Sequence, residues 1–245
     1  MLEIRGLTKT FGSLSVFEGL CGGIEIGKIT TLIGPSGSGK STLLNILAGV
    51  DDDFSGTFEY PPPGATAYVF QDDNLLPWRT ALENVELPSE LKSHRGRQKL
   101  YDEKISSIFS EFGLSGFQDH LPSELSGGMR RRISLIRAFI SNPMLLLLDE
   151  PFTGLDFEIK VHIQKWVLSN LNRSSMATVL VTHDIDDAVT LSDEIWVLSQ
   201  RPAEIVDKIS VEREQFGVSY NFDPVSIRKT PYYMEVIDRL YGALQ

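Results

Sequence analysis

The chain has 245 residues, of which 42% are hydrophobic and 23% are charged, and its formal net charge is −10. This composition is typical of a globular protein with a sizeable core, and the negative charge argues against a nucleic-acid partner, which would need a basic face. No apolar run is long enough to span a bilayer, and the N-terminal residues lack the apolar region of a secretory signal. The single cysteine, Cys21, excludes an internal disulfide and fits a reducing compartment, and we expect it to be a small packing residue rather than a reactive thiol.

The first 33 residues are predicted to form short strands separated by turns. A strand is expected over Leu2–Leu7, a turn over Thr10–Gly12, and a further strand over Ile24–Ile33 that is broken at Gly27 and Lys28. The aromatic residue of that turn, Phe11, is expected to be exposed.

The segment after these strands has the pattern of a phosphate-binding loop. A β-branched, apolar run ends at Gly34, a helix is expected to begin near Lys40, and between them lies G-x-x-x-x-G-K-S. Small residues let the backbone wrap around phosphate oxygens with its N–H groups pointing inward, and the helix start adds partial positive charge. Lys40 can neutralise the β- and γ-phosphates, and the Ser41 hydroxyl can ligate Mg²⁺. The candidate binding residues are Gly34, Pro35, Ser36, Gly37, Ser38, Gly39, Lys40, Ser41 and Thr42.

The next part of the chain continues with strands. They are expected over Thr57–Tyr60 and Ala67–Phe70, joined by a surface connection at Pro61–Gly64, because consecutive prolines cannot pair in a sheet. The second strand ends at Gln71, which begins a loop with an apolar cluster at Leu75–Trp78.

Over residues 80–141 the pattern changes to helices, which predicts a helical insertion within an α/β domain. A short helix is expected to start over residues 80–85, a second is expected over residues 101–112, and a third after Ser126. Residues 92–99 form a basic segment between the first two helices. A solvated loop is the plainer interpretation of this segment, and contact with anionic lipid head groups is the alternative.

After residue 141 the chain returns to alternating strands and helices. Uninterrupted apolar runs at Met144–Leu148 and Thr178–Val181 suit strands of a parallel sheet that is covered on both faces. A helix is expected between them, and a further strand at Ile195–Leu198. Apolar residues at helical spacing over Tyr233–Leu244 predict a last helix, which is expected to pack on its own domain rather than on a partner.

Two carboxylates follow the first of these apolar runs. Ligands of parallel sheets bind at the carboxyl ends of the strands. Asp149 can therefore hold Mg²⁺, directly or through water, and Glu150 can accept a proton from an attacking water molecule. A phosphate loop alone would suit a kinase, a GTPase, a helicase or a transport ATPase, so other motifs must decide.

The deciding motif is a second glycine-containing helix start, Leu125-Ser126-Gly127-Gly128-Met129, which also suits anionic oxygens. Together with the phosphate loop and the two carboxylates, it resembles the ATP-binding subunits of ABC (ATP-binding cassette) transporters, over at least residues 2–200. The resemblance implies an α/β fold: a P-loop ATPase core with a parallel sheet, an N-terminal antiparallel β-subdomain and an inserted helical subdomain. The implied single domain, residues 1–245, has a core with the β-subdomain (1–79 and 142–210), a helical subdomain (80–141) and a C-terminal extension (211–245).

The resemblance also implies how one chain would bind and hydrolyse ATP. Phe11 resembles the aromatic residue that stacks on adenine, and the phosphate loop would bind the ATP phosphates. Gln71 resembles the glutamine that senses the γ-phosphate, and it would ligate Mg²⁺ together with Ser41 and Asp149. Glu150 would be the general base.

Other motif residues of the resemblance concern the γ-phosphate and a second copy of the chain. His183 would steady the γ-phosphate and the attacking water, and Asp156 would communicate across a homodimer. Ser126, Gly127 and Gly128 would close on the ATP held by the second copy. Two departures are minor: three consecutive arginines, residues 130–132, follow the signature where a glutamine commonly interrupts them, and Thr153 stands where a small residue is common.

One cassette without membrane helices favours an importer subunit that is made as a separate chain. The segments Gln71–Thr80, Glu150–Phe152 and Arg201–Pro202 resemble the group of importers for nitrate, sulfonates and taurine. The resemblance therefore implies an ATPase, peripheral on the cytoplasmic face of the membrane, that powers import of small organic or inorganic anions. Its partners would be a second copy, membrane permease subunits and a substrate-binding protein. An exporter cassette and a soluble ABC ATPase without a transport role are the alternatives. Trp78 could insert into a groove for a permease helix, and the plainer interpretation is that it folds back onto the helical insertion; the two are compatible.

Overall fold

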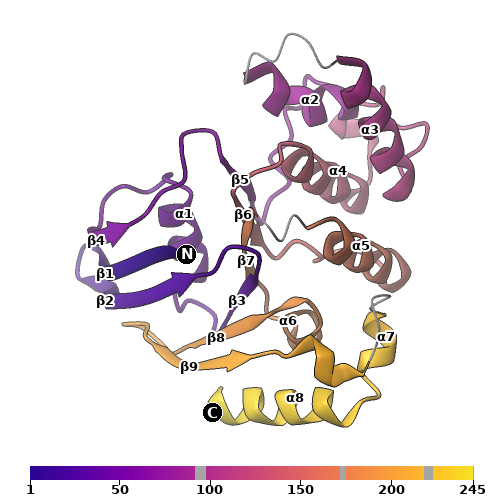
Figure 1. The fold of residues 1–245 in the computed structure, drawn as a ribbon. Helices are drawn as coiled ribbons and strands as arrows, with labels where there is room; N and C mark the ends of the chain where they lie inside the picture. The colour runs from indigo at the N-terminus through magenta and orange to yellow at the C-terminus, as the bar shows by residue number, and fades with distance from the viewer. Residues whose placement is uncertain (92–97, 172–174, 218–222, 245) are drawn as a thin grey trace.

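The computed structural model describes residues 1–91, 98–171, 175–217 and 223–244, which form two β-sheets surrounded by helices (Figure 1). The strands are β1 (Leu2–Phe11), β2 (Leu14–Ile24), β3 (Ile29–Ile33), β4 (Ser55–Phe58), β5 (Thr66–Val69), β6 (Leu145–Asp149), β7 (Ala177–Val181), β8 (Glu194–Leu198) and β9 (Ile205–Ser210). The helices are α1 (Lys40–Leu47), α2 (Ala81–Leu91), α3 (Gln98–Glu111), α4 (Gly127–Ile140), α5 (Phe157–Asn170), α6 (Ile185–Leu191), α7 (Pro224–Ile227) and α8 (Pro231–Ala243), with 3-10 turns at Pro122–Glu124 and Arg213–Phe216.

The larger sheet has the strand order β5-β6-β7-β3-β8-β9, in which β9 alone runs antiparallel to its neighbour. The apolar strands β6 and β7 are buried along their whole length, as the uninterrupted apolar runs predict. The smaller sheet, β2-β1-β4, is antiparallel. These two sheets and the helices confirm the predicted α/β fold with a mainly parallel core sheet and an N-terminal antiparallel one.

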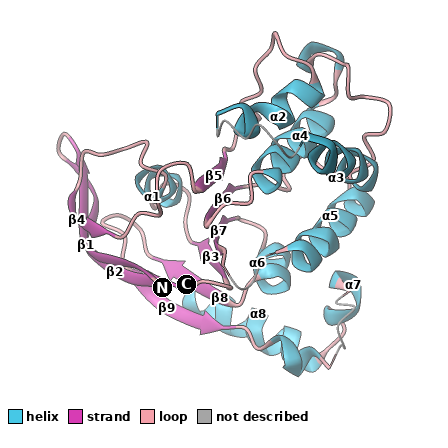
Figure 2. Cartoon of the chain, turned by 45° about the horizontal axis from the view of Figure 1, so that its top comes forward, coloured by secondary structure: helices cyan, strands magenta, loops and turns pink. Residues whose placement is uncertain are grey.

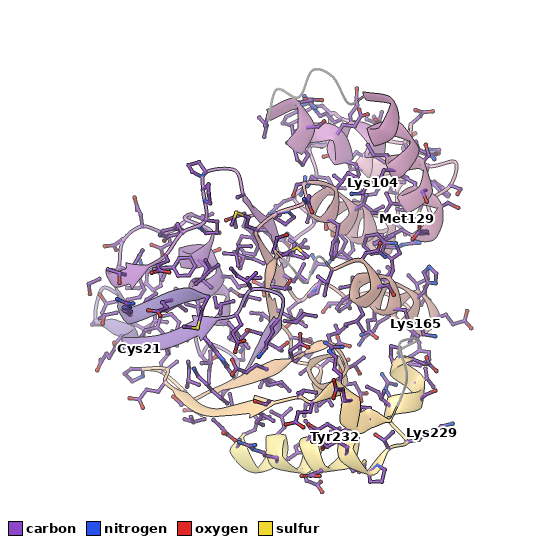
Figure 3. The ribbon with its side chains drawn as sticks, viewed as in Figure 1. Cys21, Lys104, Met129, Lys165, Lys229 and Tyr232 are labelled. Carbon is purple, nitrogen blue, oxygen red and sulfur yellow. The ribbon has the colours of Figure 1, made fainter. Side chains whose placement is uncertain are left out.

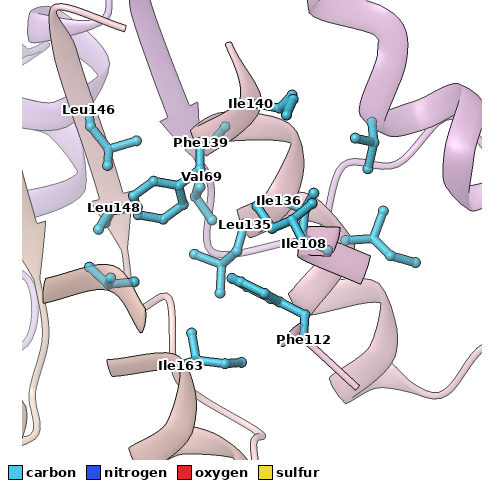
Figure 4. Packing of buried hydrophobic residues seen from close by; sticks show 14 of the residues in the cluster. Val69, Ile108, Phe112, Leu135, Ile136, Phe139, Ile140, Leu146, Leu148 and Ile163 are labelled. Carbon is cyan, nitrogen blue, oxygen red and sulfur yellow. The ribbon is translucent and has the colours of Figure 1, made fainter. Parts of the chain in front are cut away.

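The parallel sheet is covered on both faces because side chains alternate along each strand. Leu145 and Leu147 pack in the cluster that contains α1, whereas Leu146 and Leu148 pack in the cluster that contains α4 and α5. Figure 4 shows Leu146 and Leu148 with Phe139 of α4 beside them. Figure 2 shows α1 on one side of the parallel strands and α5 and α6 on the other.

The predicted helical insertion contains α2, α3 and α4. The Thr80 hydroxyl accepts from the backbone N–H of Glu83, and the Glu83 carboxylate accepts from the N–H of Thr80, so a capping box starts α2. This helix starts where it was predicted and continues to Leu91. Residues 92–97 of the basic segment lie outside the described residues. The subdomain boundaries at 79/80, 141/142 and 210/211 stay predictions.

The N-terminal prediction is wrong in three places. Strand β1 extends through Phe11, so the turn is at Gly12 and the next residue rather than over Thr10–Gly12. Strand β2 was not predicted, because its glycines resemble turn signals. Cys21 lies on β2 with an exposed side chain (Figure 3), and is not a buried packing residue.

The C-terminal extension packs on its own chain, as predicted. Tyr233, Val236 and Leu240 of α8 are buried in a cluster with residues of β8 and α6, and α8 runs alongside β9 (Figure 1). Within the described ranges, none of the helices is both long and apolar enough to cross a membrane.

Candidate functional site

The carboxyl ends of four neighbouring parallel strands meet at one edge of the larger sheet. The phosphate loop follows β3, Gln71 follows β5, Asp149 and Glu150 end β6, and His183 follows β7. A cleft of about 460 Å³ opens at this edge. Its position agrees with the general location of ligand sites in parallel sheets.

Most of the predicted site residues line this cleft. They are Phe11, Gly34, Ser36, Gly37, Gly39, Lys40, Ser41, Thr42, Gln71, Asp149, Glu150 and His183. Pro35 and Ser38 belong to the same loop but face its interior, where the Pro35 carbonyl and the Ser38 hydroxyl accept hydrogen bonds from Lys40 Nζ at 2.9 and 3.2 Å. Ser126, Gly127, Gly128 and Asp156 are not among the residues that line the cleft.

The phosphate loop needs glycine at its end. Gly39 has φ 99° and is the N-cap of α1, a conformation that side chains rarely adopt. An added Cβ would also lie 2.5 Å from Val16 Cγ1. The following residue, Lys40, is half-buried, and burial lowers its pKa while Glu150 and Asp149 act in the opposite direction. The loop therefore presents an ammonium group beside two carboxylates.

Oxygen donors suited to Mg²⁺ lie together in the cleft. The Asp149 carboxylate is buried and lies near the Ser41 hydroxyl. Burial raises the pKa of Asp149, and the Ser41 hydroxyl opposes that shift. Because a hard cation prefers carboxylate, hydroxyl and amide oxygens, Ser41, Asp149 and the cleft residue Gln71 fit a magnesium ion.

Glu150 is held beside the cleft by several contacts. It has φ 52°, a left-handed conformation that is uncommon for a residue with a side chain. Its Oε2 accepts from Thr153 Oγ1 at 3.0 Å and lies 2.5 Å from His183 Nδ1, while its N–H donates to the carbonyl of Val181 at 2.9 Å. A fixed carboxylate next to an imidazole has the composition needed for proton transfer from water.

The aromatic ring of Phe11 is 52% exposed at the rim of the cleft. Lys9 Nζ lies 4.6 Å from the ring centroid. This lysine is buried, and it donates to Asp51 Oδ1 at 2.8 Å and to the carbonyl of Asp53 at 2.5 Å. The ring is therefore fixed against a cation and remains available for stacking.

Ser126 and Asp156 each directly precede a helix, and neither lines the cleft. The Ser126 hydroxyl accepts from the N–H of Met129 and caps α4, and the Asp156 carboxylate accepts from the N–H of Ile159 and caps α5. The two turns lie together, because an added Cβ on Gly128 would be 3.5 Å from the carbonyl oxygen of Gly154. Each residue thus has a capping role within the chain that sequence reasoning did not assign.

The structure adds residues to the cleft and corrects one expectation nearby. Val16 and Arg201 also line it, and a Cβ on Gly37 would lie 2.6 Å from Arg201 Nη2, so the guanidinium lies against the phosphate loop. Arg201 entered the sequence analysis only as part of a family resemblance. Trp78 is 72% exposed, so the expectation that it folds back onto the helical insertion is wrong.

Comparison with known proteins decides the family. The family model described as ABC transporter matches residues 17–153, more than half of the chain. The chain belongs to the ABC transporter family. As a member of that family it is an ATP-binding ATPase, in agreement with the phosphate loop and the carboxylates of the cleft.

Relatives of this ABC ATPase agree over most of their length. The aliphatic sulfonates import ATP-binding protein SsuB 1 of Pseudomonas syringae pv. syringae (strain B728a) is 38% identical over 212 residues, which cover 86% of this chain and 86% of that protein. The aliphatic sulfonates import ATP-binding protein SsuB 2 of Mesorhizobium japonicum is 41% identical over 202 residues, which cover 82% of this chain and 78% of that protein.

Solved structures of other cassettes share the fold. A dimeric structure of a post-hydrolysis state of the ATP-binding cassette MJ0796, bound to ADP and Pi, matches with a TM-score of 0.77 and 28% identity. The match covers 86% of this ABC ATPase and 99% of the MJ0796 chain. A second dimeric structure of MJ0796, described as a bacterial ABC transporter cassette, gives the same TM-score of 0.77.

Proposed function

We propose that this ABC ATPase powers the import of aliphatic sulfonates across a membrane. The observation that carries the proposal is the identity of 38% over 86% of the chain with a protein named for aliphatic sulfonate import. The cleft supplies the chemistry such a subunit needs, because it combines a phosphate loop, a candidate base and an adenine-stacking ring. Taurine, which is itself an aminoalkanesulfonate, and nitrate are the other cargoes that the resemblance implies, since each carries a small anionic oxygen group.

ATP binds, in this proposal, with its adenine on Phe11 and its phosphates in the loop from Gly34 to Thr42. Ser41, Asp149 and Gln71 would hold Mg²⁺, which would supply neutralisation of the phosphate charge. Glu150 accepts a proton from the attacking water. His183, beside the Glu150 carboxylate, steadies that water and the γ-phosphate.

A second copy of the chain completes the site. Ser126, Gly127 and Gly128 lie outside the cleft of their own chain, although their helix start suits an anionic oxygen. In a homodimer they would close on the γ-phosphate held by the other copy, and Asp156 would communicate between the two sites. The dimeric MJ0796 structures, one of them with ADP and Pi, support this arrangement by fold.

The loop that begins at Gln71 supports contact with a membrane permease. It ends at Trp78, whose indole is 72% exposed, and Leu91 at the end of α2 is 77% exposed. Large exposed apolar side chains are typical anchors of protein interfaces. We infer a subunit that is peripheral on the cytoplasmic face of the membrane, bound to permease subunits and supplied by a substrate-binding protein.

Growth on a sulfonate tests the function directly. A strain that lacks this gene should fail to grow when an alkanesulfonate is the sole sulfur source and should grow normally on sulfate. The wild-type gene should restore growth, whereas Glu150→Gln should not. Unimpaired growth of the deletion strain on unsubstituted alkanesulfonates, with loss of growth on taurine or nitrate, would reassign the cargo to one of those two compounds.

A second experiment separates import from the alternatives. Trp78→Ala should leave the basal ATPase of the purified subunit intact and should release the subunit from isolated membranes into the soluble fraction. A subunit that never sediments with membranes would favour the soluble ABC ATPase. Export of the anion from loaded vesicles on ATP addition, without uptake in the opposite direction, would favour the exporter.

A further inference from the structure

The guanidinium of Arg131, on α4, joins the ends of two strands beneath the cleft. The residue is 4% exposed. Its Nη1 donates to the carbonyl oxygens of Phe70 and Gln71 at 2.5 and 2.9 Å. Its Nη2 donates to the carbonyl oxygens of Asp149 and Glu150 at 3.0 and 2.5 Å. One side chain therefore binds the backbone at the end of β5 and at the end of β6.

Arginine is suited to this position by the shape of its guanidinium. Its donors form a rigid, planar fork, so two pairs of acceptors can be held at once in a fixed relation. A glutamine, the residue that commonly interrupts arginines after such a signature, has two donors on a single nitrogen. A lysine has three donors on its single ammonium nitrogen. Neither a glutamine nor a lysine side chain can therefore bind both pairs of carbonyl oxygens with the same geometry.

The most consequential of these four bonds goes to Glu150. Its left-handed backbone, with φ 52°, is a conformation that persists only when surrounding contacts hold it. On one side its N–H donates to Val181, and on the other its carbonyl accepts from Arg131. The direction of the Glu150 side chain depends on that backbone, and therefore on the guanidinium.

Other arginines of α4 bind the loop that begins at Gln71. Arg130 Nε donates to Asp73 Oδ2 at 3.2 Å, and Arg137 donates to the carbonyls of Asn74 and Asp73 at 2.9 and 3.3 Å. Three arginines of α4 thus hold successive residues of this loop. Arg131 is the one whose bonds reach the candidate base as well.

We propose that Arg131 is a positioning residue for hydrolysis, which fixes the Glu150 backbone and ties it to the Gln71 loop. The inference rests on the proposed role of Glu150 as general base. A shift of the Gln71 loop is transmitted to Glu150 through a single guanidinium, so loop and base move together. Arg131 does not contact nucleotide, and its loss affects turnover rather than ATP binding.

The first test compares Arg131→Met with a matched arginine outside α4. Arg213 is half-buried, its Nε donates to Asp193 Oδ1 at 2.9 Å, and it is not among the residues that line the cleft. Arg131→Met should lower kcat about 10- to 100-fold, because small displacements of a catalytic group have effects of that size. The KM for ATP should change less than about threefold. Arg213→Met should lower the melting temperature and leave kcat within about twofold.

The second test is a double-mutant cycle with Glu150→Gln. If Arg131 acts through Glu150, adding Arg131→Met to Glu150→Gln should cause no further loss of kcat. An equal loss in both backgrounds, an unchanged kcat for Arg131→Met, or the same kcat loss for Arg213→Met would each overturn the positioning role. Normal turnover of Glu150→Gln alone would instead overturn the base assignment, so the two failures are distinguishable. Where Arg131→Met does not fold, Arg131→Lys carries the same cycle.

Discussion

Glu150 and His183 follow neighbouring strands and lie 2.5 Å apart, yet their segments are attached to the rest of the molecule by different chemistry. The Glu150 segment is attached through backbone carbonyls that accept from the guanidinium of Arg131. The His183 segment is attached through carboxylates of the next helix, because Lys160 Nζ lies 2.6 Å from both Asp184 and Asp187.

In the part of the C-terminal extension that the structure describes, the contacts add to the second attachment and not to the first. Asp186, on α6, accepts from the hydroxyl of Tyr233 and lies 3.6 Å from Arg228. Lys165 of α5 pairs with Asp223 at 2.8 Å. A carbonyl-to-guanidinium attachment has no group that titrates between acidic and neutral pH, whereas an attachment through carboxylates has groups that titrate at acidic pH. The comparison predicts that the His183 side is sensitive to pH and the Glu150 side is not.

The largest expected effect is on kcat, and it comes from a substitution at Glu150, the residue whose backbone Arg131 holds. Glu150→Gln keeps the shape of the side chain and removes its basicity, so kcat for ATP hydrolysis should fall by about 10²–10⁴-fold. ATP-bound dimer should accumulate, visible by size-exclusion chromatography with ATP. Glu158→Gln, an exposed acid in the first turn of α5, is the control and should retain turnover. Near-normal hydrolysis by Glu150→Gln would exclude this residue as the base.

Sequence patterns predicted the parts of this site that are encoded locally. The phosphate loop follows from glycine spacing over nine residues, and β6 from an apolar run that ends in Asp149 and Glu150. The strand-end rule placed Asp149 and Glu150 at one edge of the sheet, whereas Gln71 and His183 were assigned to the same site only through the resemblance to ABC cassettes.

Contacts between distant parts of the chain could not be predicted. Gly22 of β2 resembles a turn residue, but an added Cβ would lie 2.4 Å from Trp196 Cη2, so the glycine serves packing against β8. The bonds of Arg131 reach a carbonyl 61 positions away. In the sequence, the three arginines after the signature were only a departure from a common pattern, without a partner to explain them.

The second prediction breaks the attachment of the His183 segment. Lys160 and Asp187 are 17% and 5% exposed, so Lys160→Met leaves a buried carboxylate with Gln164 as its remaining partner. Loss of one partner of a buried pair should cost about 3 kcal/mol in the free energy of unfolding. Urea unfolding at pH 7.5 measures it. Lys165→Met, on the same helix but in the exposed pair with Asp223, should cost less than about 1 kcal/mol. Equal costs for the two variants would contradict the difference in burial.

The third prediction tests the pH sensitivity itself. Burial raises the pKa of Asp187 to about 6, although bonds from Lys160 and Gln164 oppose the shift. Because the folded state then binds a proton more tightly than the unfolded state, the free energy of unfolding falls as pH rises from about 4 to about 6 and is level above. The raised pKa of Lys160 does not contribute in this window, since its effect is constant until strongly alkaline pH.

Asp187→Asn removes this titration and keeps an acceptor for Gln164. Relative to the variant, the wild-type protein should lose roughly 1 kcal/mol of unfolding free energy between pH 5 and pH 7.5. Urea unfolding of both proteins at the two pH values measures the difference. If the free energy of unfolding of the wild-type protein instead rose with pH relative to the variant, the ion pair with Lys160 would outweigh burial. The pKa of Asp187 would then be lowered rather than raised, and the prediction would be wrong.

The smallest expected effects come from two arginines of the C-terminal extension, and they test whether the extension only packs against the core or also helps to position the site. The guanidinium carbon of Arg228 lies 5.6 Å from the ring centroid of Phe157, which directly follows Asp156, and one of its nitrogens contacts Asp186. Arg228→Leu should cost about 0.5–1 kcal/mol, because the ion pair is long and partly exposed. Arg239→Leu, which breaks a pair with Asp207 away from α5 and α6, should cost a similar amount.

Arg228→Leu and Arg239→Leu differ in whether they remove contacts to the helices α5 and α6. Arg228 contacts both α5 and α6, so its loss should also lower kcat about twofold, while Arg239→Leu should leave kcat unchanged. Steady-state ATPase assays on both variants, at a temperature well below either melting transition, measure the difference. If both variants lose stability and neither loses turnover, the extension only packs against the core, and the attachment of the His183 segment reduces to the bonds of Lys160.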